Sequence, residues 1–310
     1  MNSELNNVND SLVAVTAKKS DKTSNIIKGI FSYLFYQNFI IVVAVLCGVL
    51  IPSIDLENYQ TLVAIDVVSS GIVAIVLMIL YQNLIISDKQ KIKELGKQGL
   101  GRFFDLLISG FFLFMAVKLA AGFLESTVFE LLGLEYETSE NQSLIELLTG
   151  SAPLLMTVSA CIMAPICEEL IFRGMVGEII KDKRVYITVS GLIFGLVHVT
   201  GSVVLIFEII ALGLIIDYAL SQKDKSKILL PVIMAVVLLI ICGIIYYFQY
   251  GNLLVKITSL NPTEVVGSIT YIIMGLYLAY IYAKHNSILL NMGIHSLNNI
   301  FSMVMILFFM

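Results

Sequence analysis

Charged side chains are scarce in this sequence. Only 14% of the 310 residues are Asp, Glu, Lys or Arg, 58% are hydrophobic, and the mean hydropathy is +0.93. Soluble domains carry about 25% charged residues, so the composition excludes an ordinary soluble protein. The apolar runs are about 20 residues long, enough to cross a bilayer. We therefore predict an all-α, polytopic transmembrane helical bundle in the cell membrane, with the lipid bilayer as its surroundings.

Cysteine is also rare, and its spacing excludes two further classes. The four cysteines all lie in apolar runs, with no CxxC pair among them. A disulfide framework and a zinc knuckle are therefore not expected. A free cysteine is most often a small buried apolar residue, although Cys167, next to Glu168, leaves a thiol nucleophile as a minor alternative.

The amino terminus shows no secretory signal. Residues 1–28 are polar, and this stretch is too long before the first apolar run to be a signal peptide. We expect a cytoplasmic tail. No glycine-rich phosphate loop, heptad repeat or low-complexity tract follows, and nucleic acid is not expected as a partner because the basic clusters have a simpler explanation in membrane topology.

Hydropathy predicts about nine membrane spans. Their approximate ranges are 29–52, 62–87, 102–126, 148–180, 185–200, 202–221, 228–249, 266–284 and 287–309. All but three of the 19 basic residues fall in the tail or in alternate loops; the exceptions are Lys118 and Arg173, inside spans, and Lys256. The positive-inside rule then places the amino terminus inside and the carboxyl terminus outside.

Three charges interrupt the fourth span. The stretch APICEELIFRG, from Ala164 to Gly174, contains Glu168, Glu169 and Arg173. Ionisable residues inside a membrane are costly and are candidates for a functional site. Glu169 and Arg173 are four residues apart and share a helix face, so they can form an ion pair. Glu168 points about 100° away from Glu169 and lacks an obvious partner.

The fifth span adds a histidine to this set. Phe194 and His198 are four residues apart and share one face of the predicted helix. Gly191 and Gly195 form a GxxxG face, which is typical of closely packed membrane helices.

The last span carries a polar stripe. Asn291, His295 and Asn299 recur every four residues on an otherwise apolar helix. At 1.5 Å per residue, Glu168 and His198 each lie about 20 Å above the inner end of their spans. His295 lies about 12 Å and Asn299 about 18 Å above theirs. Three helices can therefore bring these four side chains together in the middle of the membrane.

These motifs resemble the signatures of the CAAX protease and bacteriocin-processing (CPBP) membrane proteins, the group that includes the type II CAAX prenyl endopeptidases. The matching motifs are Glu168-Glu169-x-x-x-Arg173, Phe194-x-x-x-His198 and His295-x-x-x-Asn299. The resemblance covers residues 148–310, which would form the protease core, and leaves three accessory helices at 29–126. The two histidines lie farther apart than the family pattern suggests, so we expect an inserted helical hairpin at about 202–249.

The resemblance implies an intramembrane endopeptidase. Glu168 and His198 would activate a water that attacks the scissile carbonyl, and His295 and Asn299 would hydrogen-bond the developing oxyanion. The supporting residues would be Glu169, Arg173, Phe194 and Asn291. The substrate would be a peptide or a membrane protein.

Metal dependence is left open by the sequence. Glu168, His198 and His295 could ligate zinc, and members of the family are often labelled metalloproteases. The sequence has no HExxH motif, and activation of water by a glutamate needs no metal. We therefore favour a site without a cofactor and keep zinc as the alternative.

Two other functions compete with proteolysis. The chain could be a non-catalytic membrane partner that regulates a sensor kinase or a transporter. A proton-coupled transporter would show paired interrupted spans in two repeats, and the sequence has no such repeat. Lysine-rich and asparagine-rich usage with short loops favours a bacterial protein, for which peptide processing, bacteriocin immunity or signalling is a more natural role than cleavage of prenylated proteins.

Overall fold

A computed structural model describes residues 22–51, 53–94, 96–136, 140–198 and 262–309. Every regular element in these ranges is helical, as the sequence predicts. The helices are α2 (Lys22–Leu50), α3 (Tyr59–Leu80), α4 (Gln82–Glu94), α5 (Gly96–Leu132), α6 (Glu140–Ser151), α7 (Pro153–Val158), η1 (Ser159–Met163), α8 (Ala164–Glu168), η2 (Glu169–Met175), α9 (Val176–Ile179), α10 (Lys183–Val197), α14 (Pro262–His285) and α15 (Ile288–Phe309).

The described helices form a polytopic membrane bundle. Six of them are long and apolar enough to cross a bilayer: α2, α3, α5, the run from α7 to α9, α14 and α15. The fifth predicted span corresponds to α10, which is shorter at 15 residues. The predicted spans at 202–221 and 228–249, and with them the proposed hairpin, lie outside the described residues. The count of nine and the inside-outside orientation stay predictions.

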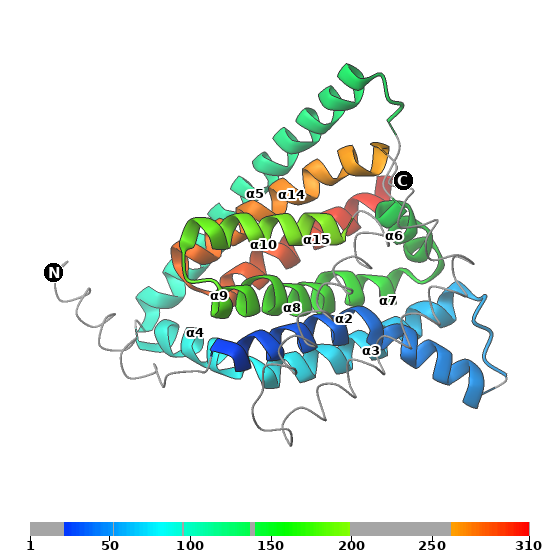
Figure 1. Cartoon of the computed structure of the whole chain (residues 1–310), viewed down its shortest axis with the longest axis horizontal. Coiled ribbons are helices and arrows are strands. Elements are labelled where there is room, and N and C mark those ends of the chain that lie inside the picture. The colour runs from blue at the N-terminus through cyan, green and yellow to red at the C-terminus, as the bar shows by residue number, and fades with distance from the viewer. Residues whose placement is uncertain (1–21, 52, 95, 137–139, 199–261, 310) are drawn as a thin grey trace.

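The run from α7 to α9 lies at the centre of the bundle. Figure 1 shows it between α2 and α3 on one side and α10 and α15 on the other, with α14 and α5 beyond them. The helix with the three intramembrane charges thus contacts both the amino-terminal helices and those that carry the other two motifs.

Local capping residues set several helix boundaries. The Asn58 side chain accepts hydrogen bonds from the first turn of α3, and Asp182 does the same for α10. The predicted span at 62–87 is interrupted at Tyr81, whose backbone leaves helical geometry between α3 and α4. Asp88 then accepts from the backbone N–H of Leu289 and from the hydroxyl of Ser287, which ties α4 to the start of α15.

The central run is not a regular α-helix. Two of its segments, η1 and η2, have the wider π-helical hydrogen-bonding pattern, and Glu168 is the last residue of the short α-helical segment between them. Segments of this kind are rare and occur often at functional sites. The sequence pattern alone, with its regular spacing of four, gives no sign of them.

The predicted GxxxG contact is confirmed. A Cβ added at Gly191 would lie 2.7 Å from the backbone nitrogen of Leu276, and one added at Gly195 would lie 2.5 Å from that of Ile272. The missing side chains thus let α10 approach the backbone of α14.

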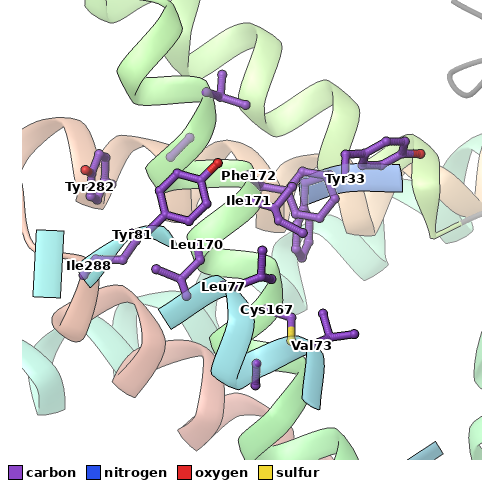
Figure 2. Packing of buried hydrophobic residues seen from close by; sticks show 14 of the residues in the cluster. Tyr33, Val73, Leu77, Tyr81, Cys167, Leu170, Ile171, Phe172, Tyr282 and Ile288 are labelled. Carbon is purple, nitrogen blue, oxygen red and sulfur yellow. The ribbon is translucent and has the colours of Figure 1, made fainter. Parts of the chain in front are cut away.

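The largest apolar core surrounds the central run. Figure 2 shows Leu170, Ile171 and Phe172 packed with Val73 and Leu77 of α3. Cys167 belongs to the same core, and its thiol donates toward the Ser70 carbonyl at 3.9 Å. The buried thiol therefore faces α3, as expected of a core cysteine.

Candidate active site

The ion pair within the central run is fully buried. Glu169 and Arg173 each have 0% exposed surface, and the Arg173 Nε lies 3.2 Å from Glu169 Oε2. The contact is close enough for an ion pair but is not aligned as a hydrogen bond. The guanidinium also lies over the Phe194 ring, 4.5 Å from its centre, and donates weakly to the Ser190 hydroxyl at 3.5 Å. Such pairing lowers the cost of burying charge.

Glu169 also joins the central run to α15. Its Oε1 accepts from His295 Nδ1 at 2.9 Å, and its Oε2 accepts from Asn291 Nδ2 at 3.2 Å. Asn291 donates as well to the Leu278 carbonyl of α14 at 2.7 Å. The family resemblance implied that Glu169 and Arg173 hold the helix and orient Glu168, whereas the contacts of Glu169 are to Arg173 and to these two residues of α15. Glu169 therefore fixes the imidazole of His295.

Glu168 faces both histidines. Its Oε2 lies 3.6 Å from His198 Nε2 and 3.8 Å from His295 Nε2, and this oxygen is buried without a hydrogen bond. Its Oε1 accepts from the Tyr36 hydroxyl at 3.2 Å. Polar atoms more than about 3.5 Å apart can be bridged by a water. The structure thus brings Glu168, His198 and His295 to one point from three helical segments.

The hydrogen bonds at Nδ1 define what each imidazole offers to Glu168. His198 Nδ1 lies 2.6 Å from the Phe194 carbonyl, which can only accept, so Nδ1 carries the proton and Nε2 is free to accept when the ring is neutral. The same reasoning applies to His295 beside the Glu169 carboxylate. Stacking on Tyr271, with ring centres 5.2 Å apart, further orients His198.

Asn299 makes no hydrogen bond to Glu168, His198 or His295. Its Nδ2 donates to the Ala160 carbonyl of η1 at 2.7 Å, and its Oδ1 accepts from Asn298 Nδ2 at 2.9 Å. The Oδ1 of Asn298 in turn accepts from Lys118 Nζ at 3.3 Å. A chain of polar contacts that ends in an intramembrane cation therefore holds Asn299 one turn beyond His295.

A cavity of about 270 Å³ opens beside Glu168 and His198. Its other walls include Tyr36 and Gln37 of α2 and Asp66 of α3. Sequence reasoning missed these residues. Asp66 lies within the predicted second span, so the rule that selected Glu168 would have selected it too. Tyr36 gives no such signal, because an isolated tyrosine in an apolar helix is common.

Glu168, His198 and His295 are residue types that bind zinc, but their side chains are not placed closely enough to hold the ion. Two imidazole nitrogens and a carboxylate oxygen are typical zinc ligands, and zinc binds them at about 2.0–2.2 Å. Within the described ranges, however, no three His, Cys, Asp or Glu side chains are grouped closely enough to hold a metal ion.

Two comparisons with known proteins support the sequence motifs. Residues 150–259 match the family described as type II CAAX prenyl endopeptidase Rce1-like. A Bacillus subtilis (strain 168) protein, named "Putative membrane peptidase YdiL", is 27% identical over 138 residues. The resemblance to the CPBP family is confirmed. The family match contains the CPBP motifs around Glu168 and His198, while the motif of His295 lies beyond it and joins the site through the fold.

The comparisons cover only part of the chain. The similarity to YdiL spans 44% of this chain and about half, 54%, of that protein. No solved structure matches the chain.

Proposed function

We propose that this protein is an intramembrane endopeptidase that hydrolyses peptide bonds with a water activated by Glu168 and His198. One observation carries the proposal: the buried Glu168 Oε2, without a hydrogen bond, lies 3.6 Å from the Nε2 of His198. A water in this gap donates one hydrogen to the carboxylate and the other to the imidazole. Its lone pairs then face away from both groups, toward a substrate carbonyl carbon.

Hydrolysis then follows as general acid–base catalysis. The water oxygen attacks the carbonyl carbon while its proton passes to Glu168, and a tetrahedral intermediate forms. Glu168 then gives the proton to the nitrogen of the leaving amine as the carbon–nitrogen bond breaks. The Tyr36 hydroxyl, bonded to the other carboxylate oxygen, holds Glu168 in position throughout.

His295 and Asn299 are proposed to stabilise the oxyanion. His295 donates from Nε2 only when its ring is doubly protonated, and in that form its Nδ1–H makes a charge-assisted hydrogen bond to the Glu169 carboxylate. Asn299 Nδ2 carries two hydrogens, of which the Ala160 carbonyl takes one. Donors preorganised in a dry site are commonly the largest single contribution to catalysis.

The proposed chemistry uses no metal. If zinc bound at Glu168, His198 and His295, it would supply an activated hydroxide. Cleavage by purified protein should therefore be unchanged after treatment with a chelator. If activity is lost with the chelator and restored by added zinc, the site depends on zinc and the metal-free chemistry is wrong.

Substitution of Glu168 by glutamine tests catalysis. Glutamine keeps the shape of the side chain but cannot take the proton, so cleavage should fall by about 10²–10⁴-fold. Glu178→Gln is the matched control: Glu178 lies on the same helical run, and its partly exposed ion pair with Lys28 contributes little to stability. Peptides and small membrane proteins that accumulate in cells with Glu168→Gln, but not with Glu178→Gln, identify the substrates.

The same variant separates catalysis from a purely regulatory role. If Glu168→Gln is as abundant as wild type and its cellular phenotype is unchanged, the protein acts by binding a membrane partner such as a sensor kinase or a transporter. We propose peptide processing, with bacteriocin immunity or peptide signalling as the biological setting, because the matched relative is a bacterial protein named as a membrane peptidase.

A further inference from the structure

A second carboxylate lies in the cavity, on α3. Asp66 and Glu168 line the same space of about 270 Å³, with Asp66 contributed by a helix outside the family match. One water occupies about 30 Å³ in the liquid, so the cavity can hold a side chain in addition to a water.

Asp66 has hydroxyl partners but no counter-charge. Its Oδ1 accepts from Ser70 Oγ at 2.9 Å, and its Oδ2 accepts from Ser159 Oγ. In the part of the chain that the structure describes, no Lys, Arg or His lies within ion-pair distance of it. Arg173, the cation of the central run, is already paired with Glu169.

A neighbouring hydroxyl is left without a partner in the same wall. Ser69 lies on α3 and lines the cavity, its side chain is fully buried, and its Oγ makes no hydrogen bond. A buried polar group without a partner costs about 1–3 kcal/mol. Ser69 and Asp66 thus line one cavity, and a bound ligand that carries hydrogen-bond donors and positive charge would satisfy the hydroxyl and the carboxylate.

We propose that Asp66 and Ser69 form a binding subsite for a basic side chain of the substrate, and this rests on the proposed peptidase function. The ammonium of a lysine would pair with the Asp66 carboxylate and donate to Ser69 Oγ. Because Glu168 and His198 form another wall of the cavity, the subsite selects a lysine or arginine near the bond that is cut.

Binding of matched peptides by an inactive protein tests the subsite. The probes are labelled decapeptides of Ala and Leu, acetylated and amidated, with one lysine at each successive position. A second set has norleucine, which lacks the ammonium, in its place. Affinities are measured with purified Glu168→Gln protein, so that cleavage does not interfere. At one or more positions the lysine peptide should bind about ten- to hundredfold more tightly than its norleucine counterpart.

Removing the Asp66 charge should remove this preference. In the Glu168→Gln background, Asp66→Asn keeps the shape of the side chain and should bring the two peptides within about threefold of each other, with norleucine binding unchanged. Asp105→Asn removes a carboxylate from an exposed position on α5 and should leave the preference intact. Ser69→Ala disturbs no existing hydrogen bond and should lower the affinity for the lysine peptides selectively. It replaces Asp66→Asn as the test if that variant fails to fold.

Three results would overturn the subsite. These are equal binding of the two peptide sets, a lysine preference that survives Asp66→Asn, and an equal loss of binding for both sets, which would give Asp66 a structural role only. Failure of the proposed function looks different: the wild type would cleave none of the peptides, while the Asp66-dependent lysine preference would still be present.

Discussion

The buried pair of Glu169 and Arg173 permits a quantitative prediction. Glu169→Gln removes the carboxylate and leaves Arg173 with a weak contact to Ser190 and the face of Phe194. Breaking a buried ion pair from one side costs about 3–5 kcal/mol, because the remaining charge stays buried and uncompensated. Against a typical total stability of about 5–15 kcal/mol, the abundance of this variant in membranes should fall strongly.

A second substitution should reverse much of this loss. Arg173→Met removes the stranded charge and fills a similar space, so the double variant should be more stable than Glu169→Gln alone by about 2 kcal/mol or more. It should nevertheless stay inactive, because His295 has lost the carboxylate that orients its ring. Stability and catalysis thus respond differently to the same pair of changes.

Unfolding in detergent micelles by titration with a denaturing detergent measures these differences. The chain has no tryptophan, so loss of helix by circular dichroism is the suitable signal. The four proteins of the double-mutant cycle give the coupling between the two positions directly. A coupling of less than about 0.5 kcal/mol, or an active double variant, would refute the structural reasoning.

Three further outcomes are expected. Tyr36→Phe should lower kcat about three- to tenfold with unchanged abundance, through loss of the hydrogen bond to Glu168, whereas Tyr59→Phe, an exposed control, should not. Gly191→Ala should lower the free energy of unfolding by about 1–3 kcal/mol, since its Cβ would meet the backbone of α14, and Gly122→Ala should not. Asp88→Asn should cost about 0.5–2 kcal/mol by weakening the cap of α15, visible in the same unfolding assay.

The membrane class and the main polar residues of the site can be predicted from the sequence. Both follow from the free-energy cost of exposing apolar side chains to water and of placing charged side chains in a membrane. Apolar runs of bilayer length have few alternatives to transmembrane helices. A charge or histidine in such a run needs a partner, and the depth estimate correctly indicated that Glu168, His198 and His295 can meet. Spacing of four also identified the pairing of Glu169 with Arg173.

The rest depends on contacts between helices, which one helix cannot reveal. The hydrogen bond from Tyr36 and the partners of Glu169 are set by how α2 and α15 pack on the central run. The position of Asn299 follows from the Ala160 carbonyl in η1, which a regular helix would direct elsewhere. Sequence periodicity assumes regular helices, so it could not predict these contacts.

Because η1 contains a wider turn, deletion of a residue there should harm the protein more than substitution of an exposed residue. Ile162 lies in this turn and is half exposed, so truncating its side chain removes little of the buried core. Deleting the residue outright would instead turn everything before it by about 100° relative to Glu168. Ser159 and the cavity wall it forms would rotate out of alignment, so a gene variant that drops the codon of Ile162 should abolish function where missense changes at Ile162 are silent.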